Sequence, residues 1–265
     1  MGIVQGLTEF LPVSSSGHLI VVPFFLDVDD AFLNSLEFSV MLHMGTLIAL
    51  LAYFWRDWLR LVPAGLAALR DRSFRGDPDR RLAWLLAAST IPAAIIGLLF
   101  EDVIETAFRN VGLVAVTLLI GAAILWLADR RAGRTKGIAD IGFPVAIGIG
   151  AAQALALVPG ISRSGISISA GRFAGLDREA AARFSFLMAT PITAGAGIFQ
   201  ASQLVSGEAG LSVAVEPLLA GMIAALLSGV IAIHVLLRFL RTHSLDVFVW
   251  YRVALAAVVL VVWLS

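Results

Sequence analysis

The residues best suited to chemistry lie in two short polar stretches, each set inside a longer apolar segment. The first, QGLTEFLPVSSSGH at 5–18, contains Glu9, three adjacent serines and His18. The second, PGISRSGIS at 159–167, places Arg163 between two serines. An arginine fork among hydroxyls and glycine-permitted N–H groups at a helix start is well suited to bind a phosphate. The expected cradle is Ser162, Arg163, Ser164, Gly165 and Ser167.

The serines and the histidine of the first stretch suggest a nucleophile. His18 follows Ser15 by three residues and could take its proton, with Glu9 orienting the ring. Ser14 and Ser16 are close enough to compete for that role. Beside a phosphate-binding arginine, this group predicts phosphoryl transfer. Direct attack by a water that Glu9 or His18 activates is the alternative, and it needs no covalent step.

Glu9 has further readings. Gln5 precedes it by four residues, so on a helix both share one face. Glu9, with Gln5 as a neutral oxygen ligand, could therefore hold a divalent cation. Alternatively, Glu9 pairs with Arg163 or satisfies loop backbone. His43 and His234 lie in apolar segments without polar company and are expected to serve in helix packing.

The composition predicts a membrane protein. Of 265 residues, 59% are hydrophobic and 14% charged, with a mean hydropathy of +0.93. A soluble domain carries about 25% charged residues, so this chain has too few charges to cover a water-facing surface. The net charge is zero, which gives no sign of nucleic-acid binding, and the absence of cysteine excludes disulfides and thiolate chemistry.

Six apolar runs are long enough to cross a bilayer as helices, which takes roughly 20 residues. They run from Phe38 to Trp55, Leu82 to Phe100, Val111 to Ala128, Phe184 to Leu204, Ala214 to Leu237 and Val247 to Leu264. Arg252, near the end of the last run, is expected to extend toward the membrane surface.

Two further apolar segments, 2–26 and 141–176, are each broken by polar residues, Pro and Gly. Backbone that leaves a helix inside lipid must be covered by protein or by a water-filled cavity, so both segments are expected to be re-entrant hairpins. Arginine is concentrated in 56–81 and basic residues in 129–140, which places these loops in the cytoplasm. The second hairpin then enters from the cytoplasm, the first from outside, and both termini lie outside.

The two polar stretches also align without a gap. Laying residues 5–18 over 153–166 makes five identities: Gln5/Gln153, Leu7/Leu155, Ser14/Ser162, Ser16/Ser164 and Gly17/Gly165. Three full spans lie between the hairpins, an odd number, which is typical of inverted-topology repeats whose broken helices meet near the midplane. The fold expected is therefore an all-α polytopic membrane protein. It has one domain over 1–265, with six transmembrane helices and two re-entrant hairpins in repeats at about 1–128 and 141–265.

These blocks resemble the undecaprenyl-pyrophosphate phosphatase family, also called bacitracin-resistance proteins. That family is marked by an acid or Gln followed after three intervening residues by a Glu, by SS-x-GH and by PGxSRSxxT. The similarity extends to YFWR at 53–56, IPAAIIGLLF at 91–100, FSFLMATP at 184–191 and the YR at 251–252. Gln5 stands where many members have Glu, and Ser167 replaces the motif's Thr.

The resemblance implies an enzyme that removes the terminal phosphate of undecaprenyl pyrophosphate, recycling the lipid carrier for cell-wall synthesis and conferring bacitracin resistance. It implies a divalent cation, Mg or Ca, and no organic cofactor. It also implies a homodimer in the bacterial inner membrane with an outward-facing site. Carried over from the family, the catalytic residues would be Glu9, Ser15, His18 and Arg163, and the substrate-binding residues would be Gln5, Ser162, Ser164 and Ser167. The spacing of the residues themselves adds Ser14, Ser16 and Gly165 to the expected substrate-binding set.

The competing function is a transporter or flippase for polyprenyl phosphate or another anion. Inverted repeats with broken helices are more often transporters than enzymes. Ser15, His18 and Glu9 beside Arg163 favour an enzyme, because transport needs the phosphate cradle but no nucleophile.

Overall fold

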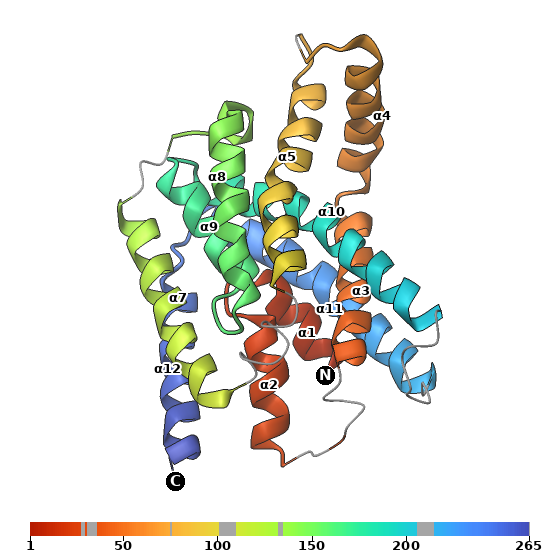
Figure 1. Ribbon diagram of the computed structural model, residues 1–265. Coiled ribbons are helices and arrows are strands. Elements are labelled where there is room, and N and C mark those ends of the chain that lie inside the picture. Colours follow the sequence, from red (N-terminus) through yellow and green to blue (C-terminus); the bar gives the residue numbers. More distant parts are fainter. Residues whose placement is uncertain are drawn as a thin grey trace.

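The chain folds into a bundle of helices (Figure 1), seen in a computed structural model that describes residues 1–27, 30, 36–74, 76–100, 110–131, 135–205 and 215–264. Within these ranges the structure has no β-strand beyond one isolated bridge. The α-helices are α1 (Gly2–Phe10), α2 (Ser15–Phe25), α3 (Leu36–Tyr53), α4 (Trp55–Asp71), α5 (Pro78–Leu99), α7 (Val111–Arg131), α8 (Phe143–Gln153), α9 (Arg163–Phe173), α10 (Arg178–Val205), α11 (Val215–Leu240) and α12 (Asp246–Leu264); short 3-10 turns are η1 (Ile138–Asp140) and η2 (Ala154–Leu157).

Within the described ranges, four helices, α5, α7, α11 and α12, are long and apolar enough to cross a membrane by length and composition. The bent pair α3 and α4 would bring the number to five. All six predicted spans fall on long helices, namely α3, α5, α7, α10, α11 and α12. The all-helical class is confirmed, while the exact number of crossings and the re-entrant path of the hairpins stay predictions.

Both broken segments are interrupted in the same way. Helix α1 ends before Leu11, which is extended (φ −64°, ψ 140°) and precedes Pro12. Turn η2 ends before Val158, which is also extended (φ −80°, ψ 116°) and precedes Pro159. The residue before a proline is pushed out of the helical region, so each X-Pro step ends a helix. In Figure 1, α1 and α2 lie in the lower half and α8 and α9 in the upper half, with the connecting loops near the middle.

The connection after α3 differs from the predicted loop. Residues 55–71 form the helix α4, bent by 84° from α3 after a break at Phe54. Leu61 and Ala68 are buried on one face of α4, while Arg60 and Arg70 face away. Counting arginines identified this stretch as a polar connection, but an amphipathic helix also tolerates them because its charges share one side.

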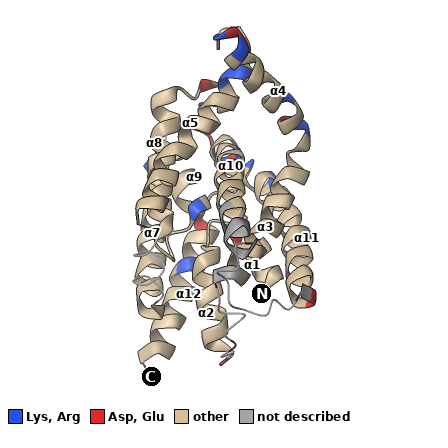
Figure 2. Cartoon of the chain, turned by 45° about the vertical axis from the view of Figure 1, so that its right-hand side comes forward, with Lys and Arg blue, Asp and Glu red and all other residues tan. Residues whose placement is uncertain are grey.

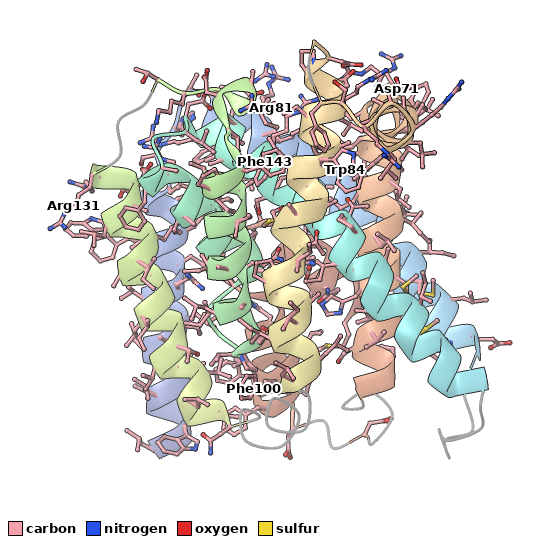
Figure 3. The ribbon with its side chains drawn as sticks, turned by 45° about the horizontal axis from the view of Figure 1, so that its top comes forward. Asp71, Arg81, Trp84, Phe100, Arg131 and Phe143 are labelled. Carbon is pink, nitrogen blue, oxygen red and sulfur yellow. The ribbon has the colours of Figure 1, made fainter. Side chains whose placement is uncertain are left out.

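Charged residues gather at one end of the bundle (Figure 2), where α4 meets α5. Figure 3 shows Asp71, Arg81 and Arg131 toward this end and Phe100 at the opposite end. The C-terminus lies at the end far from α4 (Figure 1). The molecule therefore has a charged pole and an apolar body.

Close packing beneath the first broken segment fixes the position of α1. A Cβ at Gly6 would lie 2.0 Å from Ser228 Oγ, so only glycine lets α1 approach α11 this closely. At the other end of α1, the buried ring of Phe10 stacks edge-on against Phe186 with centroids 5.5 Å apart. This packing holds Glu9, the residue before Phe10, in a defined place.

Candidate active site

The two loops that follow the proline breaks share one unusual conformation. Ser14 and Ser162 have positive φ angles of 74° and 76°, and the side chain of each accepts from the backbone N–H three residues on. A non-glycine residue in this region is strained and persists only where its surroundings fix it. Here the two serines cap the first turns of α2 and α9, helices of 11 residues each, and these caps hold the strained backbone in place.

The loops also bind each other. Ser14 Oγ accepts from Gly160 N at 3.1 Å, and Ser164 Oγ donates to the Leu11 carbonyl at 3.1 Å. Gly160 has φ +96°, and a Cβ there would lie 1.9 Å from Thr117 Oγ1. The predicted meeting of the two polar stretches is thus what the structure has.

Adjacent residues of α12 support the two loops from outside. The two broken segments, 2–26 and 141–176, are called the first and the second unit below. The Tyr251 hydroxyl lies 2.7 Å from His18 Nε2 in the first unit. Arg252, fully buried, donates from Nη2 to the carbonyls of Gly160 and Ile161 at 2.8 and 2.5 Å. The expectation that Arg252 extends to the membrane surface was wrong, because its hydrogen bonds to these loop carbonyls hold it inside.

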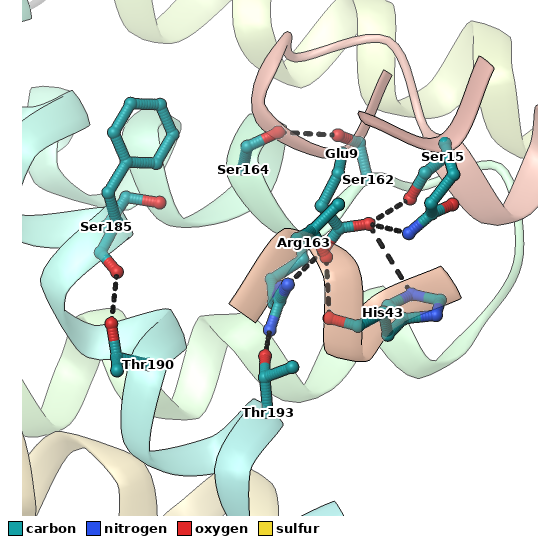
Figure 4. A network of polar contacts seen from close by, with 12 residues as sticks. Glu9, Ser15, His43, Ser162, Arg163, Ser164, Ser185, Thr190 and Thr193 are labelled. Atoms are coloured by element: carbon teal, nitrogen blue, oxygen red, sulfur yellow. Dashed lines mark hydrogen bonds and ion pairs between the residues drawn. The ribbon is translucent and has the colours of Figure 1, made fainter. Parts of the chain in front are cut away.

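Glu9 is the centre of the site (Figure 4). Only 5% exposed, it forms an ion pair with Arg163 through Oε1. Its other oxygen, Oε2, accepts from Ser15 Oγ at 2.5 Å and from Gln5 Nε2 at 2.9 Å. His43 Nε2 lies 3.4 Å from the same oxygen. A buried carboxylate needs such partners to offset its lost hydration.

Arg163 starts α9 and extends across to α10, where Nη1 donates to Thr193 Oγ1 at 2.5 Å (Figure 4). The predicted pairing of Arg163 with Glu9 is therefore made. Nothing in the sequence pointed to Thr193, which lies in a long apolar run without a motif of its own.

His18 does not contact Ser15 as predicted. Its Nδ1 lies 2.7 Å from the Ser14 carbonyl, which can only accept, and its Nε2 contacts Tyr251. In the neutral ring both nitrogens are thus satisfied by protein. The reason is position: His18 is one turn into α2, where its ring folds back on the preceding carbonyl.

His43 takes the place beside Glu9 instead. Its Nδ1 contacts the Ser39 carbonyl at 2.7 Å, leaving Nε2 toward the carboxylate. The expectation that His43 lies without polar company was wrong, because it contacts Glu9. The sequence did carry a signal, because an ionisable residue within a membrane span is functional by default.

These residues border a cavity of about 400 Å³. Five predicted site residues line it: Glu9, Ser15, Ser16, Ser162 and Arg163. The other predicted residues do not line it: Gln5, Ser14, His18, Ser164, Gly165 and Ser167, whose side chains or N–H groups make hydrogen bonds to other parts of the protein. Gln153, His43 and Thr193 line it without having been predicted.

The remaining wall of the cavity is apolar. Val40, Met44, Ala93, Leu157 and Ile192 are part of it. A ligand with an anionic head and an apolar chain would satisfy both parts, the head at Arg163 and the chain along this wall.

The family model described as bacitracin resistance protein BacA matches residues 1–258. The chain belongs to this family. Among curated relatives, the undecaprenyl-diphosphatase of Desulforudis audaxviator is 46% identical, covering 99% of this chain and 95% of the relative. That of Gemmatimonas aurantiaca is 48% identical (98% and 94% covered), and that of Moorella thermoacetica 45% (100% and 96%). Family and apolar helices together make this a multi-pass membrane protein.

Among the described residues, no group of three or more His, Cys, Asp or Glu side chains is placed to hold a metal ion. Glu9 supplies a carboxylate, and Gln5, which donates to it through Nε2, carries a buried amide oxygen, Oε1, without a hydrogen bond. This donor set fits a hard cation whose other ligands come from substrate phosphates and water, as Mg²⁺ prefers.

Proposed function

We propose that this protein hydrolyses undecaprenyl pyrophosphate to undecaprenyl phosphate and inorganic phosphate. The observation that carries the proposal is the hydroxyl of Ser15 held 2.5 Å from Glu9 Oε2 in a cavity that Arg163 also lines. The relatives' name, undecaprenyl-diphosphatase, supports the same substrate.

In the proposed reaction, Arg163 and Thr193 bind the terminal phosphoryl group and orient it toward Ser15. The Ser15 proton passes to Glu9, the only carboxylate in contact with that hydroxyl among the described residues. Ser15 Oγ bonds to the terminal phosphorus as the bridging P–O bond breaks, and undecaprenyl phosphate leaves. Water then cleaves the phosphoserine and releases inorganic phosphate. Direct attack by water with Glu9 as base gives the same products and is distinguished by Ser15→Ala.

This assignment moves proton transfer from His18 to Glu9. A general base must first be within hydrogen-bond reach of the proton that it takes. Glu9 meets this condition, while His18 bonds to Ser14 and Tyr251. His18 is then a residue that positions the first loop.

A divalent cation, Mg²⁺ or Ca²⁺, is part of the proposal and would be held by Glu9 and Gln5. It would neutralise phosphate charge, on which phosphoryl transfer chiefly depends. The chain's own residues perform the other roles, and no organic cofactor is needed for hydrolysis of an anhydride.

The proposed setting is the bacterial plasma membrane, with the charged pole in the cytoplasm and the cavity reached from outside. The arginines of 56–81 support this orientation by the positive-inside rule. The re-entrant path of both hairpins, six crossings and a homodimer complete the proposal.

Transport of polyprenyl phosphate is the weaker candidate, because a carrier does not need a hydroxyl nucleophile such as Ser15 hydrogen-bonded to a carboxylate. Phosphate release by purified protein in detergent tests the choice. Wild type should release phosphate from undecaprenyl pyrophosphate, and Arg163→Ala should be slower by about 10³-fold. Arg241→Ala, which removes an exposed arginine paired with Glu179 outside this cavity, is the matched control. A wild-type protein that releases no phosphate but moves polyprenyl phosphate across vesicle membranes would favour the carrier function.

A further inference from the structure

Gln153 has a buried amide without a protein partner. It is the last residue of α8, its side chain is 3% exposed, and it borders the same cavity as Glu9 and Arg163. Within the part of the chain that the structure describes, neither Nε2 nor Oε1 makes a hydrogen bond. Leaving buried polar atoms unpaired is costly, so such a group in a native protein requires an explanation.

The aligned residue in the first unit shows what is different. Gln5 Nε2 donates to Glu9, four residues later on α1. Four residues after Gln153 the chain has Leu157, which offers no acceptor. The Nε2 of Gln5 thus has an acceptor within its own helix. The equivalent amide of Gln153 has none and is available to a ligand in the cavity.

The surroundings of Gln153 select the chemistry of that ligand. Arg163 and Ser162 line the same cavity, and the guanidinium, which pairs with Glu9 in this structure, can bind an anionic group that replaces the carboxylate. Ala156 and Leu157 are apolar neighbours in sequence and also line it. An amide nitrogen offers two N–H donors, which suit oxygens of a phosphoryl group.

We infer that Gln153 binds a phosphoryl oxygen of the pyrophosphate head through Nε2 and so fixes its orientation toward Ser15. This inference rests on the proposed function, and it makes Gln153 a substrate-binding residue contributed by the second unit. The Nε2 of Gln5, by contrast, is already bonded to Glu9.

Two variants of the full-length protein in detergent test this assignment. Gln153→Met keeps the length of the side chain but removes both polar atoms. It should unfold at the same temperature as wild type or higher, because the unpaired amide is gone. Its KM for undecaprenyl pyrophosphate should rise about tenfold or more. Gln153→Glu keeps the shape, replaces the donors by a carboxylate beside the phosphate, and should raise KM further.

Inorganic pyrophosphate supplies a second readout that does not require turnover. It should raise the unfolding temperature of wild type and do so much less for both variants. Leu155→Met, on the adjacent turn η2 and 54% exposed, is the control and should match wild type in every measurement.

A rise in KM without a loss of thermal stability is what a merely structural glutamine would not give. The inference is overturned if either variant folds and binds pyrophosphate and substrate as wild type does. It is equally overturned if Gln153→Met lowers the unfolding temperature while KM stays unchanged. A wild type that is stabilised by pyrophosphate through Gln153 yet hydrolyses nothing would instead contradict the proposed function alone.

Discussion

Ser14 and Ser162 occupy matching places in two loops that are 148 positions apart and face each other. Each has a positive φ, and each accepts a hydrogen bond from a backbone N–H at the start of the following helix. Ser14 Oγ also accepts from Gly160 N, in the loop that Ser162 ends. Neither loop therefore has its conformation independently of the other, and the site belongs to the pair.

Ser14 and Ser15 should respond differently to the same substitution. Ser14→Ala removes the acceptor for the N–H groups of Gly17 and Gly160 and should cost about 1–2 kcal/mol of stability, typical of a lost helix cap. Ser15→Ala should keep the unfolding temperature and lose activity by about 10³-fold. Thermal unfolding and phosphate release, measured on both variants, check this. Near-normal turnover by Ser15→Ala would show that water attacks directly.

The two histidines offer a second matched pair. His43→Gln should lower turnover about tenfold or more, because it alters the group 3.4 Å from Glu9 Oε2. His18→Phe should chiefly lower the unfolding temperature, since it removes two hydrogen bonds worth about 1 kcal/mol each. Steady-state rates and melting curves decide between them. A fully stable but inactive His18→Phe would return the catalytic role to His18.

Removal of divalent cations should lower phosphate release. With Glu9 the only carboxylate lining the cavity among the described residues, most of the cation's ligands would be substrate oxygens and water, so binding should be weak and readily reversed by EDTA. Added Mg²⁺ or Ca²⁺ should restore the rate. Gln5→Ala should raise the concentration of cation required without abolishing turnover. Full activity in EDTA would contradict this prediction.

The absence of native cysteine makes topology directly measurable. Ser265→Cys should react with a membrane-impermeant thiol reagent added outside intact cells. Arg70→Cys, in α4 at the charged pole, should react only after the membrane is permeabilised. The reverse pattern would place the charged pole outside and invert the proposed orientation.

The features of the fold that could be predicted were those that depend on residues close together in the sequence. Proline after Leu11 and after Val158 breaks both apolar segments, and the shared serines and glycines mark the two loops as equivalent. The Glu9–Arg163 contact followed from bringing those loops together. Whether the similarity of the loops extends to repeats over 1–128 and 141–265 stays a prediction.

Other features depended on tertiary neighbours that a local reading does not contain. His43 reaches Glu9 only because α3 packs beside α1, and Thr193 reaches Arg163 only through α10. The interior place of Arg252 depends on loop carbonyls 91 and 92 positions away in the chain. Hydropathy alone could not distinguish such an arginine from one at the membrane surface.

Glu9 and Arg163 neutralise each other across the two loops, so the carboxylate is an intramolecular competitor for every anion that approaches the guanidinium. A monovalent anion gains little by replacing a carboxylate of equal charge, whereas a multiply charged pyrophosphate gains more. In the proposed reaction, Glu9 is freed to take the Ser15 proton when Arg163 transfers to the substrate. The internal pair would then re-form once the product departs and oppose its rebinding. In this proposal, the exchange of Arg163 between Glu9 and the substrate makes the site selective for multiply charged anions and activates Glu9 as a base. The same exchange speeds the release of phosphate and lowers the affinity for substrate.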